Sequence, residues 1–331
     1  MAAQNASKKR KTKMKNKVTL AIMMVILVLC AAFFVAQYFG FDLSWLTGPQ
    51  REAKPVTEGT LEVHMIDVGQ GDCILIRAPK GNMLIDAGEN KEEVETAIKT
   101  YLENLGVTEF EYVVFTHSDA DHIGSADYVL DNYAVDNVIM PVDDERSTKV
   151  YESMMSAIDR NGADIKDAVA GNTYSIGEME FTVLAPRGEG YKDVNDYSVV
   201  LRIDFGESSF LMTGDAEAKS EKEMVTKYKE FDLDCDVLKV GHHGSNTSSS
   251  EDFLALVTPE VAIISCGEGN KFNHPRKEAV DRIDDHTGTK IYRTDLVGDI
   301  VLITDGQKIT CGDVILVDES NGSSSDENVF G

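Results

Sequence analysis

Four residues whose side chains bind metal ions fall within six consecutive positions of this chain: His117, Asp119, Asp121 and His122. The β-branched and aromatic run at 112–115 is typical of a buried strand, and the apolar-periodic segment after Gly124 indicates a helix. Imidazole and carboxylate together suit zinc, manganese or iron, and side chains two residues apart on extended chain point the same way. A polar loop with one Asp or Ser N-cap is the alternative, but a cap needs one such residue and not four. The segment therefore predicts a metal site.

The sequence HSDADH resembles the H-x-[HD]-x-D-H signature of the metallo-β-lactamase superfamily. The form of this motif with Asp in the third place resembles the hydrolase domain of the ComEC/Rec2 competence proteins. Further segments match that family in its order, over roughly Leu61 to Val317. They are HMIDVGQGDCILI with Asp67, Gln70 and Asp72, MLIDAG with Asp86, LMTGDAE with Asp215, LKVGHHGSNTSSS with His242 and His243, and FNHPR with His274. The set is specific as a whole, and HSDADH is the one segment that would carry the resemblance alone.

The resemblance implies two neighbouring divalent metal ions. His117 and Asp119 are expected to bind the first ion, and Asp121 with His122 the second. Asp215 matches the carboxylate that bridges both ions in the family. The structural alternative for Asp215 is an ordinary capped helix start, because T-G-D-A-E also fits that pattern.

Two adjacent histidines follow the strand expected at 237–240. Adjacent side chains on extended chain point opposite ways, so both cannot easily bind one ion. We favour His243 as a ligand of the second metal and His242 as a neighbour that faces substrate, and the opposite assignment stays open. His274 matches the family's last motif and is expected at the site, with an ordinary helix-start histidine as the alternative.

The chain also departs from the broader superfamily. Many members place a third histidine for the first metal between the two ligand segments, where this chain has Asn195-Asp196-Tyr197-Ser198. That region is similar to the competence-protein version. The first ion is therefore expected to be weakly held or completed by water. Asp119 adds an anionic oxygen in place of histidine, so manganese stands beside zinc as a candidate metal.

A divalent ion lowers the pKa of bound water, so that hydroxide is available near neutral pH. Asp121 is expected to orient the hydroxide as well as to bind metal. His242 or His274 would stabilise developing charge or protonate the leaving oxygen, and these three residues are the catalytic candidates. The Gly-rich turn from Asp67 to Asp72 is expected beneath the metals, where Asp72 or Asp67 could accept a hydrogen bond from a ligand. The alternative for that turn is that its glycines serve only to let the backbone change direction.

The elements that must position these residues alternate between strands and helices, and several strands have hairpin spacing. Mixed sheets are therefore expected rather than one parallel sheet. The resembling family has two mixed sheets packed face to face with helices outside, an α+β fold of αββα type. Strands are predicted at 61–67, 73–76, 83–85, 112–115, 137–140, 179–184, 198–203, 209–212, 237–240, 261–264, 290–293 and 299–304, and helices at 92–105, 147–160, 218–228, 250–257 and 275–285.

The chain begins with an arm at 1–17 that has seven Lys or Arg and no acidic residue. Residues 18–41 then carry no formal charge and would span about 36 Å as a helix, enough to cross a bilayer. We predict a single-pass signal anchor with the basic arm in the cytoplasm and everything after Asp42 outside. A cleaved signal peptide is the alternative, but the apolar run is too long for it. A linker at 42–59, a hydrolase domain at 60–318 and a disordered tail at 319–331 complete the expected organisation.

The charge balance weakens a nucleic-acid interpretation without excluding it. Removing the seven basic residues of the arm leaves 25 basic against 57 acidic residues, a net of −32. Such a chain repels DNA at long range unless metals and a local basic strip compensate. The four cysteines after the apolar run lack C-x-x-C spacing, which favours small buried side chains, although a disulfide stays open. They are Cys73, Cys235, Cys266 and Cys311.

Three classes of function follow. A metal-dependent phosphodiesterase of nuclease type leads, with DNA as one candidate substrate, because the resemblance includes the competence-protein motifs. A hydrolase of another cell-surface ester or amide, such as a phosphocholine ester or a lactam, comes second. A non-catalytic metal-binding domain is third and is disfavoured, because almost every ligand position of the family's site is filled. With one expected membrane span, the chain is not itself expected to form a DNA-uptake pore.

Overall fold

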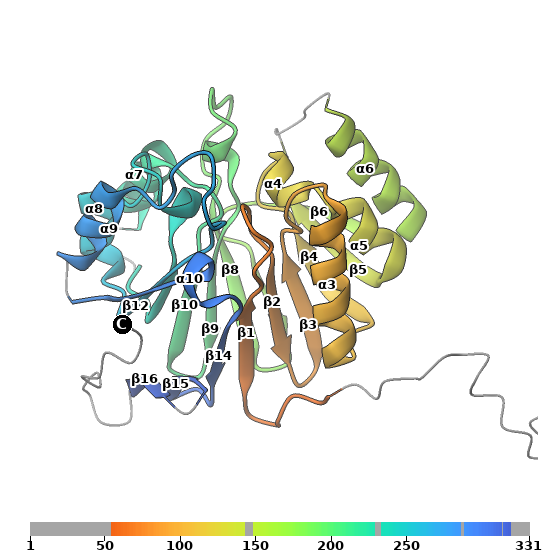
Figure 1. The fold of residues 1–331 in the computed structure, drawn as a ribbon, viewed down its shortest axis with the longest axis horizontal. Helices are drawn as coiled ribbons and strands as arrows, with labels where there is room; N and C mark the ends of the chain where they lie inside the picture. Colours follow the sequence, from red (N-terminus) through yellow and green to blue (C-terminus); the bar gives the residue numbers. More distant parts are fainter. Residues whose placement is uncertain (1–53, 143–147, 229–232, 286–287, 313, 319–331) are drawn as a thin grey trace, which may run out of the picture. The chain divides into compact units, whose positions relative to one another are not determined.

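The computed structural model describes residues 54–142, 148–228, 233–285, 288–312 and 314–318 (Figure 1). The basic arm, the expected membrane span, most of the linker and the tail lie outside these ranges, and their assignments stay predictions. Within the described ranges no helix is both long and apolar enough to cross a membrane.

Two mixed sheets form the framework. The nine-stranded sheet has the order β16-β15-β14-β1-β2-β3-β4-β5-β6, and its last three pairings, from β3 to β6, are parallel. Its strands are β1 (Leu61–Met65), β2 (Ile74–Ala78), β3 (Gly81–Ile85), β4 (Glu109–Val114), β5 (Ala134–Met140), β6 (Asp164–Asp167), β14 (Ile300–Thr304), β15 (Lys308–Cys311) and β16 (Val314–Asp318).

The seven-stranded sheet has the order β13-β12-β11-β10-β9-β8-β7, with parallel pairing from β10 to β13 and antiparallel pairing elsewhere. Its strands are β7 (Thr173–Ile176), β8 (Met179–Ala185), β9 (Val200–Phe205), β10 (Ser208–Met212), β11 (Val237–Lys239), β12 (Val261–Ile264) and β13 (Lys290–Arg293). Both sheets are mixed, as the hairpin spacing predicted.

Helices cover the outer face of each sheet, so that four layers result (Figure 1). On the nine-stranded sheet lie α3 (Glu92–Leu105), α4 (Ala120–Ile123), α5 (Ala126–Asn132) and α6 (Lys149–Asn161). On the seven-stranded sheet lie α7 (Ala218–Lys227), α8 (Glu251–Val257) and α9 (Lys277–Asp284), and the short helix α10 (Thr294–Val297) follows β13. The expected αββα sandwich is confirmed.

Successive side chains of a strand face opposite sides of its sheet, and this alternation forms the apolar layers of the fold. In β10, Phe210 and Met212 face the core between the sheets, whereas Leu211 packs against α7 and α8. In β2, Ile74 and Ile76 likewise face the other sheet. One strand therefore supplies side chains to two apolar layers, which holds both sheet faces out of water.

Some elements differ from the prediction. Helix α3 and strands β12 and β13 coincide with the predicted ranges, but β6, β7, β15 and β16 were missed. β6 reads DIKD and β7 reads TYSI, and both are largely exposed at the ends of their sheets, so their apolar period is weak or absent, whereas the missed β16 is an apolar run, VILVD. The cysteines fit the prediction, because the four within the described residues are all free thiols, three of them buried and Cys311 half-buried.

The sheet topology brings the motif segments together. Asp86 follows β3 and His117 follows its parallel neighbour β4, while Asp215 follows β10 and His243 follows its parallel neighbour β11. Parallel neighbours end at the same edge of a sheet. The candidate ligands of each sheet therefore gather at one edge, and the packed sheets set these two edges beside each other.

Candidate metal centre

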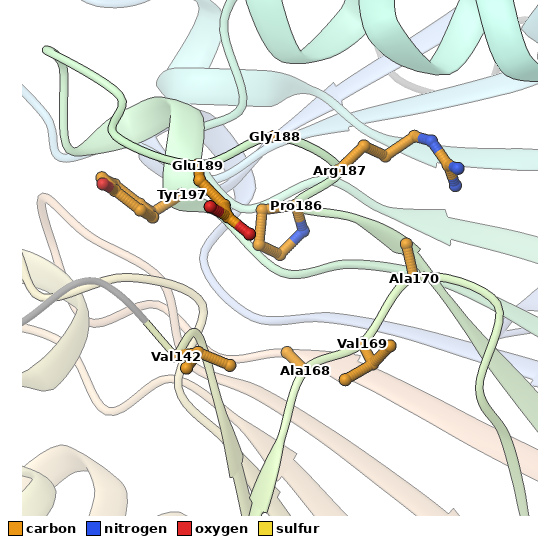
Figure 2. A pocket seen from close by; sticks show the side chains of 9 residues that line it. All are labelled: Val142, Ala168, Val169, Ala170, Pro186, Arg187, Gly188, Glu189 and Tyr197. Carbon is orange, nitrogen blue, oxygen red and sulfur yellow. The ribbon is translucent and has the colours of Figure 1, made fainter.

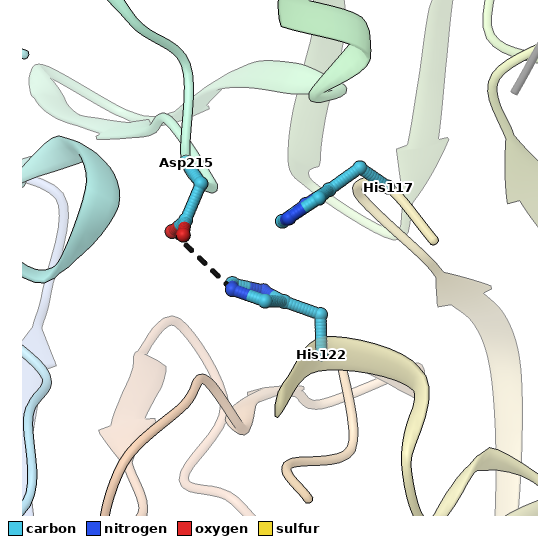
Figure 3. Close-up of side chains that lie close together, drawn as sticks. All are labelled: His117, His122 and Asp215. Carbon is cyan, nitrogen blue, oxygen red and sulfur yellow. Dashed lines mark ion pairs between the residues drawn. The ribbon is translucent and has the colours of Figure 1, made fainter. Parts of the chain in front are cut away.

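His117, His122 and Asp215 form the first group of candidate ligands, with one nitrogen or oxygen from each within 4.8 Å of the others. All three side chains are buried, and Figure 3 shows them pointing into a common space. His122 Nε2 lies 3.3 Å from Asp215 Oδ1. Within the described part of the chain, His117 Nε2 is buried without a hydrogen-bond partner. A metal ion is the group that would satisfy such an atom, so the residues fit one.

Asp121, His122 and His243 form the second group. His243 Nε2 lies 3.3 Å from His122 Nε2 and 3.5 Å from Asp121 Oδ2. The same nitrogen lies 3.3 Å from Asp215 Oδ2, the oxygen of that carboxylate not directed at His122. Asp215 thus presents one oxygen to each group, which is the arrangement that a carboxylate shared by two ions requires.

The histidine pair does not lie on extended chain, so the premise for choosing between them was wrong. His242 and His243 have φ of 47° and 53° in a 3₁₀ turn at Gly241–Gly244. Their side chains still diverge. His243 is buried with Nδ1 2.8 Å from the Ser265 carbonyl oxygen, and His242 is part-exposed with Nδ1 2.9 Å from Glu217 Oε1. His243 belongs to the ligand groups, and its role as a ligand remains a prediction.

Residues behind the histidines fix how each ring is oriented. Asp86 Oδ2 lies 2.7 Å from His122 Nδ1 and also accepts a hydrogen bond from the Thr116 hydroxyl at 2.7 Å. The hydroxyls of Thr116 and Ser198 lie 3.0 and 3.5 Å from His117 Nδ1. Each contact holds Nδ1 and leaves Nε2 facing the centre, as partners of metal-binding histidines commonly do.

Lys239 is a buried cation that the sequence reasoning treated only as part of a strand. It is fully buried, with Nζ 2.5 Å from Asp72 Oδ2, 3.0 Å from the Gly214 carbonyl oxygen and 3.8 Å from Asp215 Oδ1. A buried carboxylate is costly without a compensating charge, so Lys239 stabilises Asp72 beneath the site. A lysine within the apolar run Val-Leu-Lys-Val was the signal available in the sequence.

Of the two acceptors proposed in the Gly-rich turn, Asp72 reaches the centre. It is buried, with Oδ1 3.5 Å from His243 Nδ1 and Oδ2 3.9 Å from His122 Nδ1. Asp67 is exposed and accepts a hydrogen bond from the Gly69 amide at 3.0 Å, so it shapes the turn instead. The turn itself packs against the ligand segment, because the Asp72 amide donates to the Asp121 carbonyl oxygen.

Asp119 and His274 lie beside the two groups. Asp119 has a side chain that is 43% exposed, with Oδ2 3.9 Å from His117 Nε2. The His274 ring centre lies 5.3 Å from that of His242 and 6.3 Å from that of His243. Asp119 as a ligand and His274 as a catalytic residue remain predictions.

The titrating groups influence one another strongly. Burial disfavours the charged form of His243, but Asp215 and Asp121 outweigh it and raise the pKa to about 9. Burial also favours protonated Asp121, yet His243 and His122 lower the pKa of that carboxyl group. Burial and the charge on His122 lower the pKa of His117. Divalent ions would displace the protons held by His122 and His243, so metal affinity is expected to rise with pH.

The Gly71→Ala variant tests the packing of the turn on the ligands. Gly71 has φ of +126°, and a Cβ there would lie 2.2 Å from the Asp121 carbonyl oxygen. We expect the variant to lose about 2–3 kcal/mol of unfolding free energy and to bind less metal, because backbone must shift at a ligand. Urea unfolding and elemental analysis of bound metal measure both effects.

Gly69→Ala is the matched control, because Gly69 has φ of +73° but nothing within 4 Å of an added Cβ. It should cost about 1 kcal/mol, the ordinary penalty of the left-handed backbone, and leave metal content unchanged. Equal metal loss in both variants would mean that backbone strain, and not the contact with Asp121, explains the effect.

The four-layer fold, with two histidine-containing ligand groups joined by one aspartate at the meeting edge of the sheets, is that of a metal-dependent hydrolase. Residues 66–268 match the family model of the metallo-β-lactamase superfamily, and the chain belongs to this superfamily. The resemblance inferred from HSDADH is thereby confirmed.

Three curated relatives are similar to the chain over most of its length. The chain is 32% identical over 255 residues to ComE operon protein 3 of Bacillus subtilis, covering 72% of this chain and 32% of the relative. It is 33% identical over 233 residues to Recombination protein 2 of Haemophilus influenzae, covering 70% and 27%. It is 31% identical over 283 residues to Competence protein ComA of Neisseria gonorrhoeae, covering 83% and 38%. The chain therefore spans about a third of the length of these relatives.

Solved structures share the fold. The metallo-β-lactamase fold protein YhfI of Bacillus subtilis has a TM-score of 0.50 and 11% identity, covering 74% of this chain and 99% of that one. CmlA, a diiron β-hydroxylase from Streptomyces venezuelae, has a TM-score of 0.52 and 16% identity, covering 75% and 55%. At these identities the likeness concerns the fold alone.

Proposed function

We propose that the chain is a phosphodiesterase of nuclease type that uses two divalent metal ions. The observation that carries the proposal is Asp215, whose two oxygens each lie 3.3 Å from a different histidine. Sites with two metals suit phosphodiesters, because paired cations can hold both the attacking and the leaving oxygen. The names of the relatives, which are a ComE operon protein, a recombination protein and a competence protein, support a substrate related to DNA.

The protein groups have separate tasks in this proposal. Bound divalent ions supply a nucleophile at neutral pH and neutralise the phosphate. His117, His122, Asp121, Asp215 and His243 would hold the ions, and Asp121 would also orient the attacking water. Zinc is the first candidate, and Asp119 at the rim favours manganese as the second.

His242 is placed to handle a proton. Its Nδ1 lies 2.9 Å from Glu217 Oε1, and its Nε2 lies 3.8 Å from Asp215 Oδ2. Glu217 fixes the ring and favours its protonated form, so His242 can donate to the leaving oxygen. His274 differs, because burial and the neighbouring His242 lower its pKa to about 4. It therefore serves this reaction as a neutral ring that contacts substrate.

A panel of substrates tests the function. The full-length chain in detergent, with zinc or manganese added, is incubated with bis-p-nitrophenyl phosphate, single-stranded DNA, p-nitrophenyl phosphorylcholine and nitrocefin. The proposal expects metal-dependent hydrolysis of the first two and no turnover of nitrocefin. The phosphocholine ester is also a phosphodiester, so it should be hydrolysed no faster than bis-p-nitrophenyl phosphate. Turnover of nitrocefin or of the phosphocholine ester alone would replace the proposal with the corresponding cell-surface hydrolase.

We also propose that residues 18–41 anchor the enzyme in a membrane with the hydrolase domain outside the cytoplasm. The seven basic residues before the uncharged run support this orientation. Protease added outside intact cells should digest the chain after Asp42, as followed by an antibody to the C-terminus. Protection of that region, with digestion only after the cells are opened, would reverse the orientation.

A further inference from the structure

The outer side of α7 carries positive charge in a chain that is strongly acidic, with 57 acidic and 32 basic residues. Lys219, Lys222 and Lys227 are exposed there. Together with Arg187 they line a groove of about 570 Å³, which we call the basic groove. Glu223 is its one acidic lining residue. Local charge of this sign opposes the repulsion of a polyanion by the rest of the surface.

The two carboxylates of α7 have hydrogen-bond partners of their own, and only Glu223 also lines the basic groove. Glu221 is buried and accepts hydrogen bonds from the Ser249 and Ser250 amides. Glu223 accepts a hydrogen bond from the Tyr191 hydroxyl. Lys219 Nζ lies 4.2 Å from the centre of the Tyr191 ring, and its positive charge also acts on the Asp196 carboxyl group.

The basic groove lies along the helix that follows Asp215 in the chain. Lys219 lies four residues after Asp215, and Glu217, which holds His242, directly precedes α7. From Lys219 to Lys227 the helix rises about 12 Å, which is long enough to lie beside more than one phosphate of an extended strand. A chain of phosphates leaving the centre along α7 could therefore meet the three lysines in turn.

A second cavity, of about 290 Å³, shares Arg187 and Gly188 with the basic groove. Figure 2 shows Val142 and Val169 on one side of it and Pro186 with Tyr197 on the other. Tyr197 directly precedes Ser198, whose hydroxyl accepts from the Asp215 amide. Apolar surface thus lies beside the same centre, where a base or sugar could rest while its phosphates follow α7.

We propose that the basic groove binds the backbone phosphates of a single nucleic-acid strand next to the bond that is cleaved. The inference rests on the proposed phosphodiesterase function and assigns its substrate class, a polynucleotide rather than a small phosphodiester. Arg187 is held in place for this contact, because it donates to the Tyr228 hydroxyl at 2.8 Å and lies over that ring.

The test measures binding by the metal-loaded full-length chain to a fluorescein-labelled 12-nucleotide strand with phosphorothioate linkages, which keep the charge but resist hydrolysis. The triple variant Lys219→Gln, Lys222→Gln, Lys227→Gln should bind about 100-fold more weakly at 0.1 M salt. The slope of log K against log salt should fall by about two, at roughly 0.7 per neutralised phosphate. Replacing the three lysines by arginine should preserve both values.

The matched control is Lys80→Gln, Lys99→Gln, Lys308→Gln, which removes the same charge outside the basic groove. It should change binding less than threefold. Equal losses of affinity in both triple variants would mean that net charge alone explains the effect. An unchanged salt slope in the α7 variant would mean that its lysines do not contact phosphates. Either result overturns the inference.

Hydrolysis of bis-p-nitrophenyl phosphate separates this inference from the proposed function. The small substrate does not reach the lysines, so the α7 variant should hydrolyse it at the wild-type rate within about twofold. A parallel loss would mean that the lysines support the metal centre, which contradicts the inference. If the wild type fails to hydrolyse it, the phosphodiesterase proposal falls, while the binding comparison still decides whether the groove holds a strand.

Discussion

Asp215→Ala is expected to remove most bound metal and reduce phosphodiester hydrolysis by more than about a thousandfold. The carboxylate lies between the two ligand groups, with one oxygen 3.3 Å from His122 Nε2 and the other 3.3 Å from His243 Nε2. Its loss therefore affects the binding of both ions. Replacing a residue that only hydrogen-bonds to a ligand typically lowers metal affinity or activity by about ten- to a hundredfold. Elemental analysis and the rate with bis-p-nitrophenyl phosphate measure the two effects.

Asp131→Ala is the control for Asp215→Ala. Asp131 is an exposed aspartate that pairs with Arg160 on the surface, so the variant should keep full metal content and rate. Near-ultraviolet circular dichroism of both variants reports whether the fold is retained. An Asp215→Ala protein that is folded and still holds two ions per chain would contradict the bridging assignment.

His243→Ala and His242→Ala are expected to differ in kind. His243 is buried among the ligand groups, so its loss should lower bound metal from two ions toward one and reduce the rate with it. His242 is held by Glu217 at the edge of the centre, so its loss should leave both ions in place and lower kcat. Metal stoichiometry and steady-state kinetics on both variants decide the assignment.

Glu217→Gln provides the internal comparison for this pair. If His242 acts as a positioned proton donor, the Glu217 variant should reproduce part of its kcat loss with metal content unchanged. Metal loss in His242→Ala alone would reverse the assignment of the two histidines. Full activity in both histidine variants would exclude this centre as the site of hydrolysis.

The local part of the centre was accessible from the sequence. His117, Asp121 and His122 lie within six positions after an apolar strand, and Asp215 directly follows a second strand and its Thr-Gly turn. Apolar runs specify strands that bury themselves, and a polar residue at the end of such a run is carried to the sheet edge. Strand and helix order likewise predicted mixed sheets, and the family resemblance implied two of them packed face to face with helices outside.

Other features had no local signal. Strands β6 and β7 are short and polar, and they are ordered by pairing with a neighbour rather than by their own apolar period. The sequence predicts extended chain at His242 and His243, because two adjacent histidines do not indicate a positive φ, but both residues have one. The contacts of Lys239 with Asp72, and of Ser198 with His117, join residues far apart in the chain.

The sequence by itself thus determined the residue types, the strands that carry them and the family. Tertiary structure decided which of those residues meet. His122 and His243 are 121 positions apart, yet their Nε2 atoms lie 3.3 Å from each other. That distance depends on the face-to-face packing of two sheets, and the burial of apolar side chains between them fixes it. The basic groove arises in the same way, because tertiary packing buries Glu221 and places Arg187 beside the lysines of α7.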